Sequence, residues 1–351
     1  MTDEMQKTRP VVAVVGATGA VGEVMLEILA ERLGKNIEVH ALASERSLGS
    51  VVNYGHRELD IEVLDDYDFA GTDYALFSAG GSISATHAPR ACAAGAIVID
   101  NTSEFRYRDE YPLVVPEVNG HALEGLGPGA LVANPNCSTM QMLVALAPIY
   151  REYGIERINV ATYQSVSGAG RKGLEELAHQ TADRLAMREV TPRAFAQPIA
   201  FNVLANIDAM QDNGYTREEM KMHWETRKIF EDDDIAVNAT AVRVPVFFGH
   251  AEAVHLETRT PADLDVVRSL LAEAPGLVLA ENDEPQNVPS PVVHAAGKDP
   301  VYVGRLRKDL SHPRGIDLWV VADNVRKGAA LNAVQILEAL EARGARSLGT
   351  P

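Results

Sequence analysis

The sequence predicts an α/β protein of two domains: a mostly parallel, doubly wound sheet, then an α+β domain with a mostly antiparallel sheet. A chain of 351 residues is too long for one small core and suits two domains of ordinary size. Apolar strand segments alternate with helical patterns over residues 1–133. Beyond them, long amphipathic helices are followed by strand patterns of alternating polarity.

The composition argues against several classes of protein. Hydrophobic residues make up 46% of the chain and charged residues 23%, which is typical of a soluble globular protein. The formal net charge of −17 argues against nucleic acid as a partner, because such a protein needs a basic face. No apolar stretch is long enough to span a bilayer and the N-terminus lacks a secretory signal, so we expect a cytoplasmic protein without a membrane partner. Cys92 and Cys137 predict neither a disulfide framework nor a metal site.

The first motif, VVAVVGATGAVGEVMLEILAERLG at residues 11–34, is an apolar strand, a glycine-rich turn and an amphipathic helix. Glycines at this spacing allow a tight turn and let backbone amides approach a pyrophosphate at the helix N-terminus. Glycines at this spacing are weak evidence for a dinucleotide site by themselves, but the flanking strand and helix make the evidence strong. The motif predicts a Rossmann-type dinucleotide-binding domain whose cofactor contacts are Gly16, Thr18, Gly19, Ala20, Val21 and Gly22.

The second predicted strand, IEVHALAS at 37–44, ends where such a fold reads the adenosine ribose. An NAD site usually has a carboxylate at this tip, whereas here Ser44 is followed by Glu45, Arg46 and Ser47. We interpret Ser44, Arg46 and Ser47 as a 2′-phosphate site, hence NADP as cofactor. A solvated loop is the alternative, and Glu45 would repel a phosphate if it turned inward.

Further strands are predicted at 72–79, 96–100 and 113–118 (LVVPEV), with a helix from Ile83 to Ala94. Ser78 and Gly80 follow the first of them, at the strand end where ligands bind in such sheets. In the second domain we expect helices at 170–189 and 216–230 and strands at 237–246, 250–259, 301–309 and 315–323. We place the first domain at 1–133, completed by the C-terminal helix 325–351, and the second at 134–324.

Cys137 is the first candidate for chemistry. It follows Asn134-Pro135-Asn136 and stands at the start of a predicted helix. The positive end of the helix dipole lowers the pKa of a thiol, and the backbone amides there suit an oxyanion. A buried structural cysteine is the usual alternative, and we favour it for Cys92.

Other segments accompany Cys137: GATGAVG at 16–22, ASERS at 43–47, YQSVSGAG at 163–170, RVPVFFGH at 243–250 and DNVRKGAALNAVQI at 323–336. With NCST at 136–139, they resemble the aspartate-semialdehyde dehydrogenase family over nearly the whole chain. The resemblance implies the NADPH-dependent conversion of L-4-aspartyl phosphate to L-aspartate 4-semialdehyde and phosphate, in the pathway to lysine, threonine and methionine. It also implies a homodimer formed through the second domain, which carries the catalytic residues.

In this resemblance Cys137 forms a thioester, His250 is the general acid/base and Gln164 is a further active-site residue. Arg243 pairs with the substrate carboxylate if the segment from Pro245 to Gly249 bends the strand. Arg108 is the alternative to Arg106 as the residue that binds phosphate. For Glu225 and Lys228, the alternative is an ordinary surface ion pair. The other implied roles are Glu225 for the substrate ammonium, Lys228 and Arg106 for phosphate with Asn136, and Ser167, Gly168 and Asn324 for the cofactor.

Two alternatives remain open. N-acetyl-γ-glutamyl-phosphate reductase shares this fold, chemistry and cofactor. Members of that family have a motif similar to HPGCYPT around the nucleophile, whereas this chain has NPNCST. A catalytically silent NADP-binding protein on the same scaffold is the alternative from another class, although Cys137, Gln164 and His250 are all present. A short-chain reductase is excluded, because no tyrosine has a lysine four residues later.

Overall fold

The structure of the chain is a computed structural model that describes residues 9–281 and 284–347. The contacts divide these residues into two compact units. The first contains residues 9–112, 121–134 and 333–347, and the second contains the described residues of 113–120 and 135–332. Residues 113–120 and 325–332, which the predicted boundaries assign to the first domain, belong to the second unit by their contacts.

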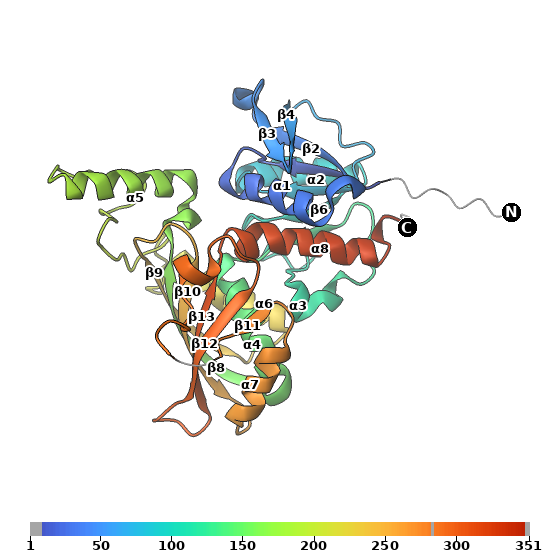
Figure 1. The fold of residues 1–351 in the computed structure, drawn as a ribbon. Coiled ribbons are helices and arrows are strands. Elements are labelled where there is room, and N and C mark those ends of the chain that lie inside the picture. Colours follow the sequence, from blue (N-terminus) through green and yellow to red (C-terminus); the bar gives the residue numbers. More distant parts are fainter. Residues whose placement is uncertain (1–8, 282–283, 348–351) are drawn as a thin grey trace. The chain divides into compact units, whose positions relative to one another are not determined.

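The first unit is built on a 7-stranded sheet in the order β3-β4-β2-β1-β5-β6-β7. Its strands β2, β3, β4 and β6 are labelled in Figure 1. Every pairing is parallel except that of the β3–β4 hairpin, which the sequence analysis missed. This confirms the Rossmann-type prediction. The elements are β1 Val11–Val15, α1 Ala20–Arg32, β2 Glu38–Ala43, β3 Val51–Tyr54, β4 Arg57–Val63, β5 Tyr74–Phe77, α2 Gly81–Ala93, β6 Ile97–Asp100 and β7 Leu131–Ala133, with short 3-10 turns at Gly34–Asn36, Glu45–Ser47, Gly120–Leu123 and Ala345–Ser347.

The strand predicted at 113–118 was wrong. Pro116 begins a short helix, α3 (Pro116–Asn119), and the edge position beside β6 belongs to β7. Proline suits the first turn of a helix because it has no N–H to donate. The Asn119 side chain bonds the Val115 N–H and the Leu113 carbonyl, which holds the turn closed.

The C-terminal segment forms two elements rather than one predicted helix. A π-helical turn, Arg326–Ala330, precedes α8, Leu331–Ala342. Within the first unit α8 lies beside α1, since Arg32 forms an ion pair with Glu338 at 2.7 Å (Figure 1). The Tyr74 hydroxyl on β5 donates to Glu341 at 2.6 Å, so this helix completes the first unit.

The second unit is built on a 6-stranded sheet in the order β11-β12-β13-β10-β8-β9. The three central pairings are antiparallel, as predicted, and the outer pairs β8–β9 and β11–β12 are parallel. The elements are α4 Cys137–Tyr153, β8 Ile155–Gln164, α5 Gly170–Leu185, α6 Arg217–Phe230, β9 Ala236–Arg243, β10 His250–Thr258, α7 Leu264–Glu273, β11 Leu277–Leu279, β12 Val301–Lys308 and β13 Gly315–Ala322, with single turns at Val166–Ala169 and Pro291–Ala295.

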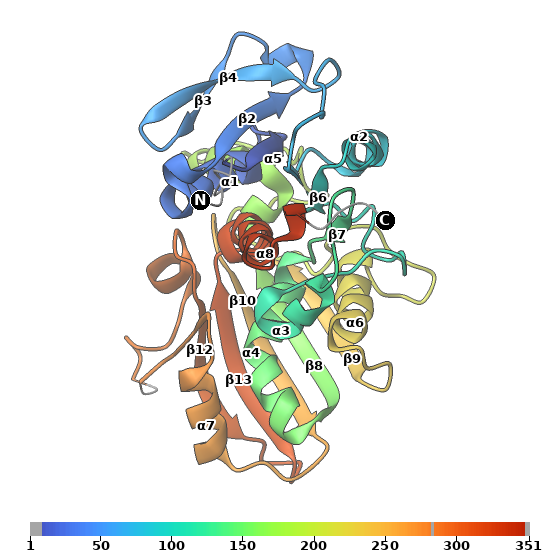
Figure 2. The same cartoon turned by 90° about the vertical axis from the view of Figure 1, so that its right-hand side faces the viewer.

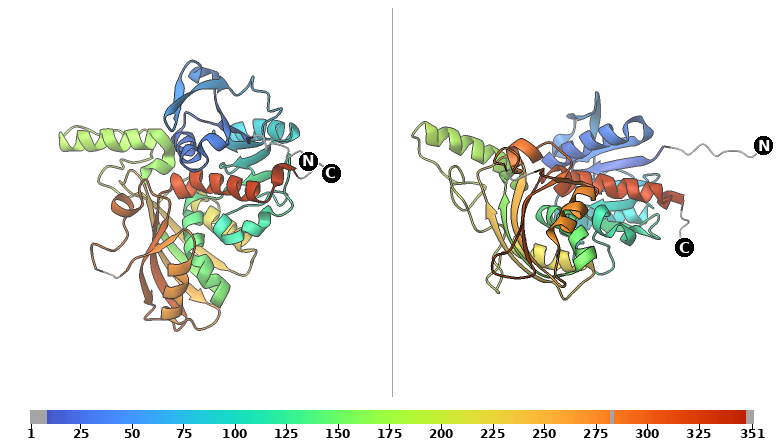
Figure 3. Two further views of the ribbon diagram at one scale, coloured as in Figure 1. Left: turned by 45° about the vertical axis from the view of Figure 1, so that its right-hand side comes forward. Right: turned by 60° about the horizontal axis from the view of Figure 1, so that its bottom comes forward.

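Helices cover one face of this sheet. Figure 2 shows α4, α6 and α7 on the same side of β8, β10, β12 and β13. Alternate residues of β10 are buried on that side, from His250 through Glu252 and Val254 to Leu256, and α4 is buried along nearly its whole length. In contrast, α5 extends away from the sheet of its own unit (Figure 3).

Candidate active site

The glycine-rich loop between β1 and α1 has the shape that a dinucleotide requires. A Cβ at Gly22 would lie 2.1 Å from the Gly16 carbonyl oxygen, and Gly16 itself has a φ of +87° and packs against Ala79. Only glycine fits at either position. No side chain caps the start of α1 at Gly19, so the first N–H groups of the helix remain available to a pyrophosphate.

A cavity of about 360 Å³ opens beside this loop, at the carboxyl ends of β1, β2, β4 and β5. Ligands bind at this edge of doubly wound sheets, so the residues present fit a dinucleotide. Arg46 and Ser47 lie in the short turn after β2, and Gly80, with a φ of +101°, precedes α2. The cavity is lined by Gly16, Thr18, Gly19, Ala43, Ser44, Leu64, Asp65, Ser78, Ala79 and Ile83.

The structure separates the two arginines proposed for phosphate. Arg106 is 7% exposed and donates to the Asn101 carbonyl at 2.7 Å. Arg108 points outward, pairs with Glu104 at 2.6 Å and lies over the Phe105 ring. Arg106 is therefore the buried guanidinium of this loop, and Arg108 belongs to a surface ion pair.

Cys137 is the first residue of α4, and its helix end is capped by Asn136. The Asn136 side-chain oxygen accepts from the backbone N–H groups of Ser138 and Thr139 at 3.0 and 3.3 Å. These two amides are thus committed to the cap rather than to a substrate oxyanion. The dipole of a 17-residue helix still favours a thiolate at its first residue.

His250 lies at the first position of β10 with no exposed surface. Its Nδ1 accepts from the backbone N–H of Ser165 at 3.1 Å, so the neutral ring carries its proton on Nε2. Nε2 is buried and has no hydrogen-bond partner among the described residues. Burial, and then the charge of Arg243, lower the pKa of His250 to about 3, so the ring is neutral at physiological pH.

Arg243 ends β9 and is 7% exposed, and its side chain donates from Nη1 to the Ser165 carbonyl at 2.7 Å. Burial lowers the pKa of Arg243, and the negative charges of Glu218 and Cys137 oppose that shift. A Cβ on Gly168 would lie 2.8 Å from Arg243 Nη1 and 3.5 Å from His250 Nε2. The loop between β9 and β10 therefore bends as expected and brings both groups to one point.

Gln164 leads to a carboxylate that the sequence analysis did not single out. Its Nε2 donates to Glu218 Oε1 at 3.1 Å, and Asn136 Nδ2 donates to the same oxygen at 2.9 Å. Lys221 pairs with the other oxygen at 2.8 Å. Burial would raise the pKa of Glu218, but the Lys221 charge and these hydrogen bonds hold it at about 2, so the carboxylate stays ionised.

Glu225 and Lys228, the predicted pair on α6, lie two turns further along the same face. Glu225 is fully buried and its Oε2 accepts from the Asn136 backbone N–H at 2.6 Å. Its carboxylate therefore supports the start of α4. The spacing Glu-x-x-Lys occurs at both 218–221 and 225–228, which was the signal for Glu218 and Lys221 in the sequence.

Ser167, Gly168 and Asn324, the residues proposed for the cofactor, lie in the network of contacts around His250. Asn324 Oδ1 accepts from the Ser165 and Ser167 hydroxyls and from the Gly249 N–H, each at 3.0 Å. This network ties the turn after β8 to the start of β10. Gly328, in the π-helical turn, lies so close to Cys137 that a Cβ there would be 2.7 Å from the Cys137 Cβ.

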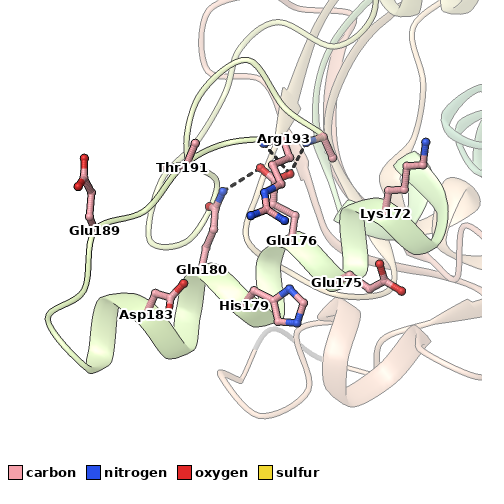
Figure 4. A pocket seen from close by; sticks show the side chains of 10 residues that line it. Lys172, Glu175, Glu176, His179, Gln180, Asp183, Glu189, Thr191 and Arg193 are labelled. Atoms are coloured by element: carbon pink, nitrogen blue, oxygen red, sulfur yellow. Dashed lines mark hydrogen bonds between the residues drawn. The ribbon is translucent and has the colours of Figure 1, made fainter.

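A second cavity, of about 700 Å³, runs along α5 and the chain that follows it (Figure 4). Its buried polar groups are occupied: Glu176 accepts from the Arg193 and Ala194 N–H groups, and Gln180 donates to Glu176. These contacts hold the loop against the helix. Among the described residues that line this cavity there is no cysteine, and the buried carboxylate Glu176 is already paired, so we do not consider it an active site.

Two further features, a membrane-spanning helix and a metal-binding cluster, are absent from the described residues. No helix in this part of the chain is long and apolar enough to cross a membrane. The same residues contain no group of three or more His, Cys, Asp or Glu side chains able to hold a metal ion. Cys92 is partly buried, and burial raises its pKa to about 11, which suits an unreactive thiol.

Comparisons with known proteins find two family models along the chain. Residues 11–126 match the family model of the semialdehyde dehydrogenase NAD binding domain, and residues 146–327 that of the semialdehyde dehydrogenase dimerisation domain. The chain is 54% identical to an aspartate-semialdehyde dehydrogenase of Legionella pneumophila over 97% of this chain and 98% of the relative. It is 56% identical to aspartate-semialdehyde dehydrogenase 2 of Vibrio cholerae over 94% and 97%.

A solved structure is similarly close. The crystal structure of aspartate semialdehyde dehydrogenase II from Vibrio cholerae, complexed with ASA, superposes with a TM-score of 0.91. It is 54% identical, with 95% of this chain and 98% of that chain covered.

Proposed function

We propose, on the premise that this chain belongs to the semialdehyde dehydrogenase family, that it reduces L-4-aspartyl phosphate to L-aspartate 4-semialdehyde with NADPH. The observation that carries the proposal is the convergence of Arg243 Nη1 and His250 Nε2 on one point, in the unit that also holds Cys137 and Glu218. A buried guanidinium without a carboxylate partner among the described residues is suited to the carboxylate of an amino-acid substrate.

Cys137 supplies the nucleophile. Its thiolate sulfur forms a bond to the acyl carbon, the carbon–oxygen bond to phosphate breaks, and phosphate leaves with the electron pair. A bound NADPH then supplies the hydride that reduces the thioester to a thiohemiacetal. When the carbonyl re-forms, the carbon–sulfur bond breaks and Cys137 is again a thiolate.

His250 acts on the substrate oxygen at Nε2. In the neutral ring this nitrogen carries the proton, because Nδ1 is held by the Ser165 N–H, so it donates a hydrogen bond to the oxygen that gains charge. Proton transfer requires the imidazolium, which burial and then the charge of Arg243 disfavour. A substrate carboxylate bound to Arg243 neutralises that charge, so substrate binding itself raises the pKa of His250 towards its working range.

Glu218 and Lys221 take over the roles assigned from the sequence to Glu225 and Lys228. The ionised Glu218 contacts Gln164 and lies close enough to Arg243 and His250 to shift their pKa values. A carboxylate beside the carboxylate-binding arginine suits a substrate with a free α-ammonium group. An N-acetylated substrate has no such charge, which favours the aspartyl reaction over the N-acetylglutamyl one.

Glu218→Gln is expected to raise the KM for L-aspartate 4-semialdehyde by about tenfold to a hundredfold, because it removes a charge-assisted contact to the substrate. Glu225→Gln is the matched variant two turns away on the same helix face. It should lower the thermal midpoint, since it weakens the bond to Asn136, and leave KM within about threefold. Equal KM values for the Glu218→Gln and Glu225→Gln variants would contradict the proposal that Glu218 binds the substrate ammonium group.

NADP is the cofactor we propose, with Ser44, Arg46 and Ser47 at its 2′-phosphate. Arg46 is exposed, and no ion pair engages it within the described residues. Arg106, the buried arginine of its loop, keeps its proposed role in binding phosphate.

The test follows NADPH formation with L-aspartate 4-semialdehyde, NADP and phosphate. The same assay is run with NAD, and with the N-acetylglutamate semialdehyde. Activity on the first aldehyde with NADP is the expected result. Activity only on the acetylated aldehyde would establish the alternative reductase, and a protein that binds NADP but turns over neither aldehyde would overturn the proposal.

We further propose a homodimer that uses the sheet face of the second unit opposite α4. A hollow of about 310 Å³ on this face is lined from β8, β9, β10 and β13, with Asn159, His255 and Asp317 among its residues. His255 follows His250 by five positions on β10, so it faces the opposite side of the strand, and it pairs with Asp317 at 3.0 Å. Sedimentation equilibrium should give twice the chain mass, and Ala253→Arg should yield monomers. A monomeric wild type would contradict the assignment.

A further inference from the structure

Beneath the catalytic residues, the interface between α4 and β10 holds a polar pair that the proposed mechanism does not use. Glu252 has no exposed surface, and neither of its carboxyl oxygens has a hydrogen-bond partner within the described residues. Gln141 is 1% exposed, and both polar atoms of its side chain are likewise unpartnered there. Four buried, unsatisfied polar atoms in one layer require a physical explanation.

The two residues adjoin the catalytic ones by register. Gln141 follows Cys137 by four positions on α4, and therefore lies one turn further along the same helix face. Glu252 follows His250 by two positions on β10, so both side chains leave the same face of the strand. Opposite Glu252 on β8 is Thr162, whose hydroxyl donates to Gln164.

A proton on Glu252 satisfies all four atoms. A carboxylic acid and a primary amide pair through two hydrogen bonds: the acid O–H donates to the amide oxygen, and the amide N–H donates to the other acid oxygen. An ionised carboxylate only accepts, so it would leave the Gln141 oxygen without a donor and bury a charge. The chemistry of the pair therefore selects the neutral acid.

The electrostatic surroundings agree. Burial raises the pKa of Glu252 well above its ordinary value, and the Gln141 amide is the one neighbour that opposes this. Titratable groups on nearby elements include Cys137 on α4, His250 on β10, Arg243 on β9, and Glu218 and Glu225 on α6, and none of them is among the causes that act on this pKa. The neighbouring strands β8 and β13 present Thr162 and Val320, which carry no charge.

We propose that Glu252 is a positioning residue, held as a neutral carboxylic acid by Gln141, that locks α4 to β10 and keeps negative charge away from the Cys137 thiolate. This inference rests on the proposed function for its catalytic consequence. Its structural part, the neutral acid beneath Cys137, is independent of the reaction.

The pH dependence of stability tests the neutral acid. Unfolded Glu252 has an ordinary pKa, whereas the native group stays protonated to higher pH, so native stability is lost as pH rises between the two values. Glu252→Gln removes this loss. Its thermal midpoint should therefore rise relative to wild type as pH increases above about 4.5, with the unfolding equilibrium differing by up to about tenfold per pH unit. The exposed Glu273→Gln on α7 is the control and should follow wild type.

The reactivity of Cys137 tests the positioning role without requiring turnover. Alkylation by iodoacetamide is measured across pH in wild type, Glu252→Gln and Glu252→Leu. Glu252→Gln should match the wild-type rate at pH values where Glu252 is protonated, and exceed it at higher pH values where wild-type Glu252 ionises and disfavours the thiolate. Glu252→Leu and Gln141→Leu should lower kcat by about tenfold to a hundredfold with the KM for NADP unchanged, because each leaves one partner unsatisfied.

Two results would overturn the inference. One is that the infrared spectra of wild type and Glu252→Gln at neutral pH show no difference in the protonated-carboxyl band. The other is a Glu252→Gln variant whose alkylation profile and midpoint follow wild type at every pH. If turnover is absent in all variants but these two readouts behave as expected, the proposed reaction fails while the neutral acid stands.

Discussion

Replacing Cys137 by alanine is expected to lower kcat for L-aspartate 4-semialdehyde oxidation by at least about 10⁴-fold, because no other residue of the site can form the thioester. Cys92 cannot substitute, since burial raises its pKa to about 11 and it lies in the other unit. Single-turnover absorbance of NADPH is the measurement, since a variant that binds normally should still show no burst.

Cys92→Ala is the matched variant, because it removes the only other thiol of the chain. It should retain full activity and full alkylation by one equivalent of iodoacetamide. A Cys137→Ala enzyme that forms NADPH at more than about a hundredth of the wild-type rate would rule out the thioester route.

Gly328→Ala is expected to reduce kcat by about a hundredfold while the protein remains folded. The added Cβ would stand 2.7 Å from the Cys137 Cβ, so the nucleophile must move, and small displacements of reacting atoms cost about this much. The affinity for NADP should not change. The measurement combines kcat, the KM for each substrate and the alkylation rate of Cys137.

Gly120→Ala is the control variant, because Gly120 has an ordinary backbone conformation that alanine can also adopt. A Cβ there meets no atom within 4 Å, so activity should be retained. If the Gly328→Ala variant has the same Cys137 alkylation rate and kcat as wild type, the π-helical turn moves to accommodate the added Cβ and Cys137 does not. That result would contradict the expectation.

Much of the first unit was predictable because its signals are local. The Gly16 and Gly22 spacing follows from contacts within one turn, and the strands on either side are continuous apolar runs. The segment at 113–118 misled because its apolar residues match a strand, while Pro116 and Asn119 favour a turn through a side-chain bond that periodicity does not record.

The sequence alone was a poorer guide to Glu218, the carboxylate of the site. Glu218 and Glu225 lie seven residues apart, two helical turns, and each precedes a lysine by three positions. Both are buried on one face of α6, so local pattern cannot separate them. Only tertiary contacts do so, since Gln164 and the Asn136 side chain meet Glu218 while the Asn136 backbone meets Glu225.

Asn136 links these observations. Its side-chain oxygen caps α4, its side-chain nitrogen contacts Glu218, and its backbone N–H contacts Glu225. The orientation of the nucleophile is thus set by a helix about eighty positions away, so NCST transplanted into another protein would not carry its reactivity with it. Engineering this chemistry into a new scaffold requires moving α6 as well, and the effects of changes in the two helices should be non-additive.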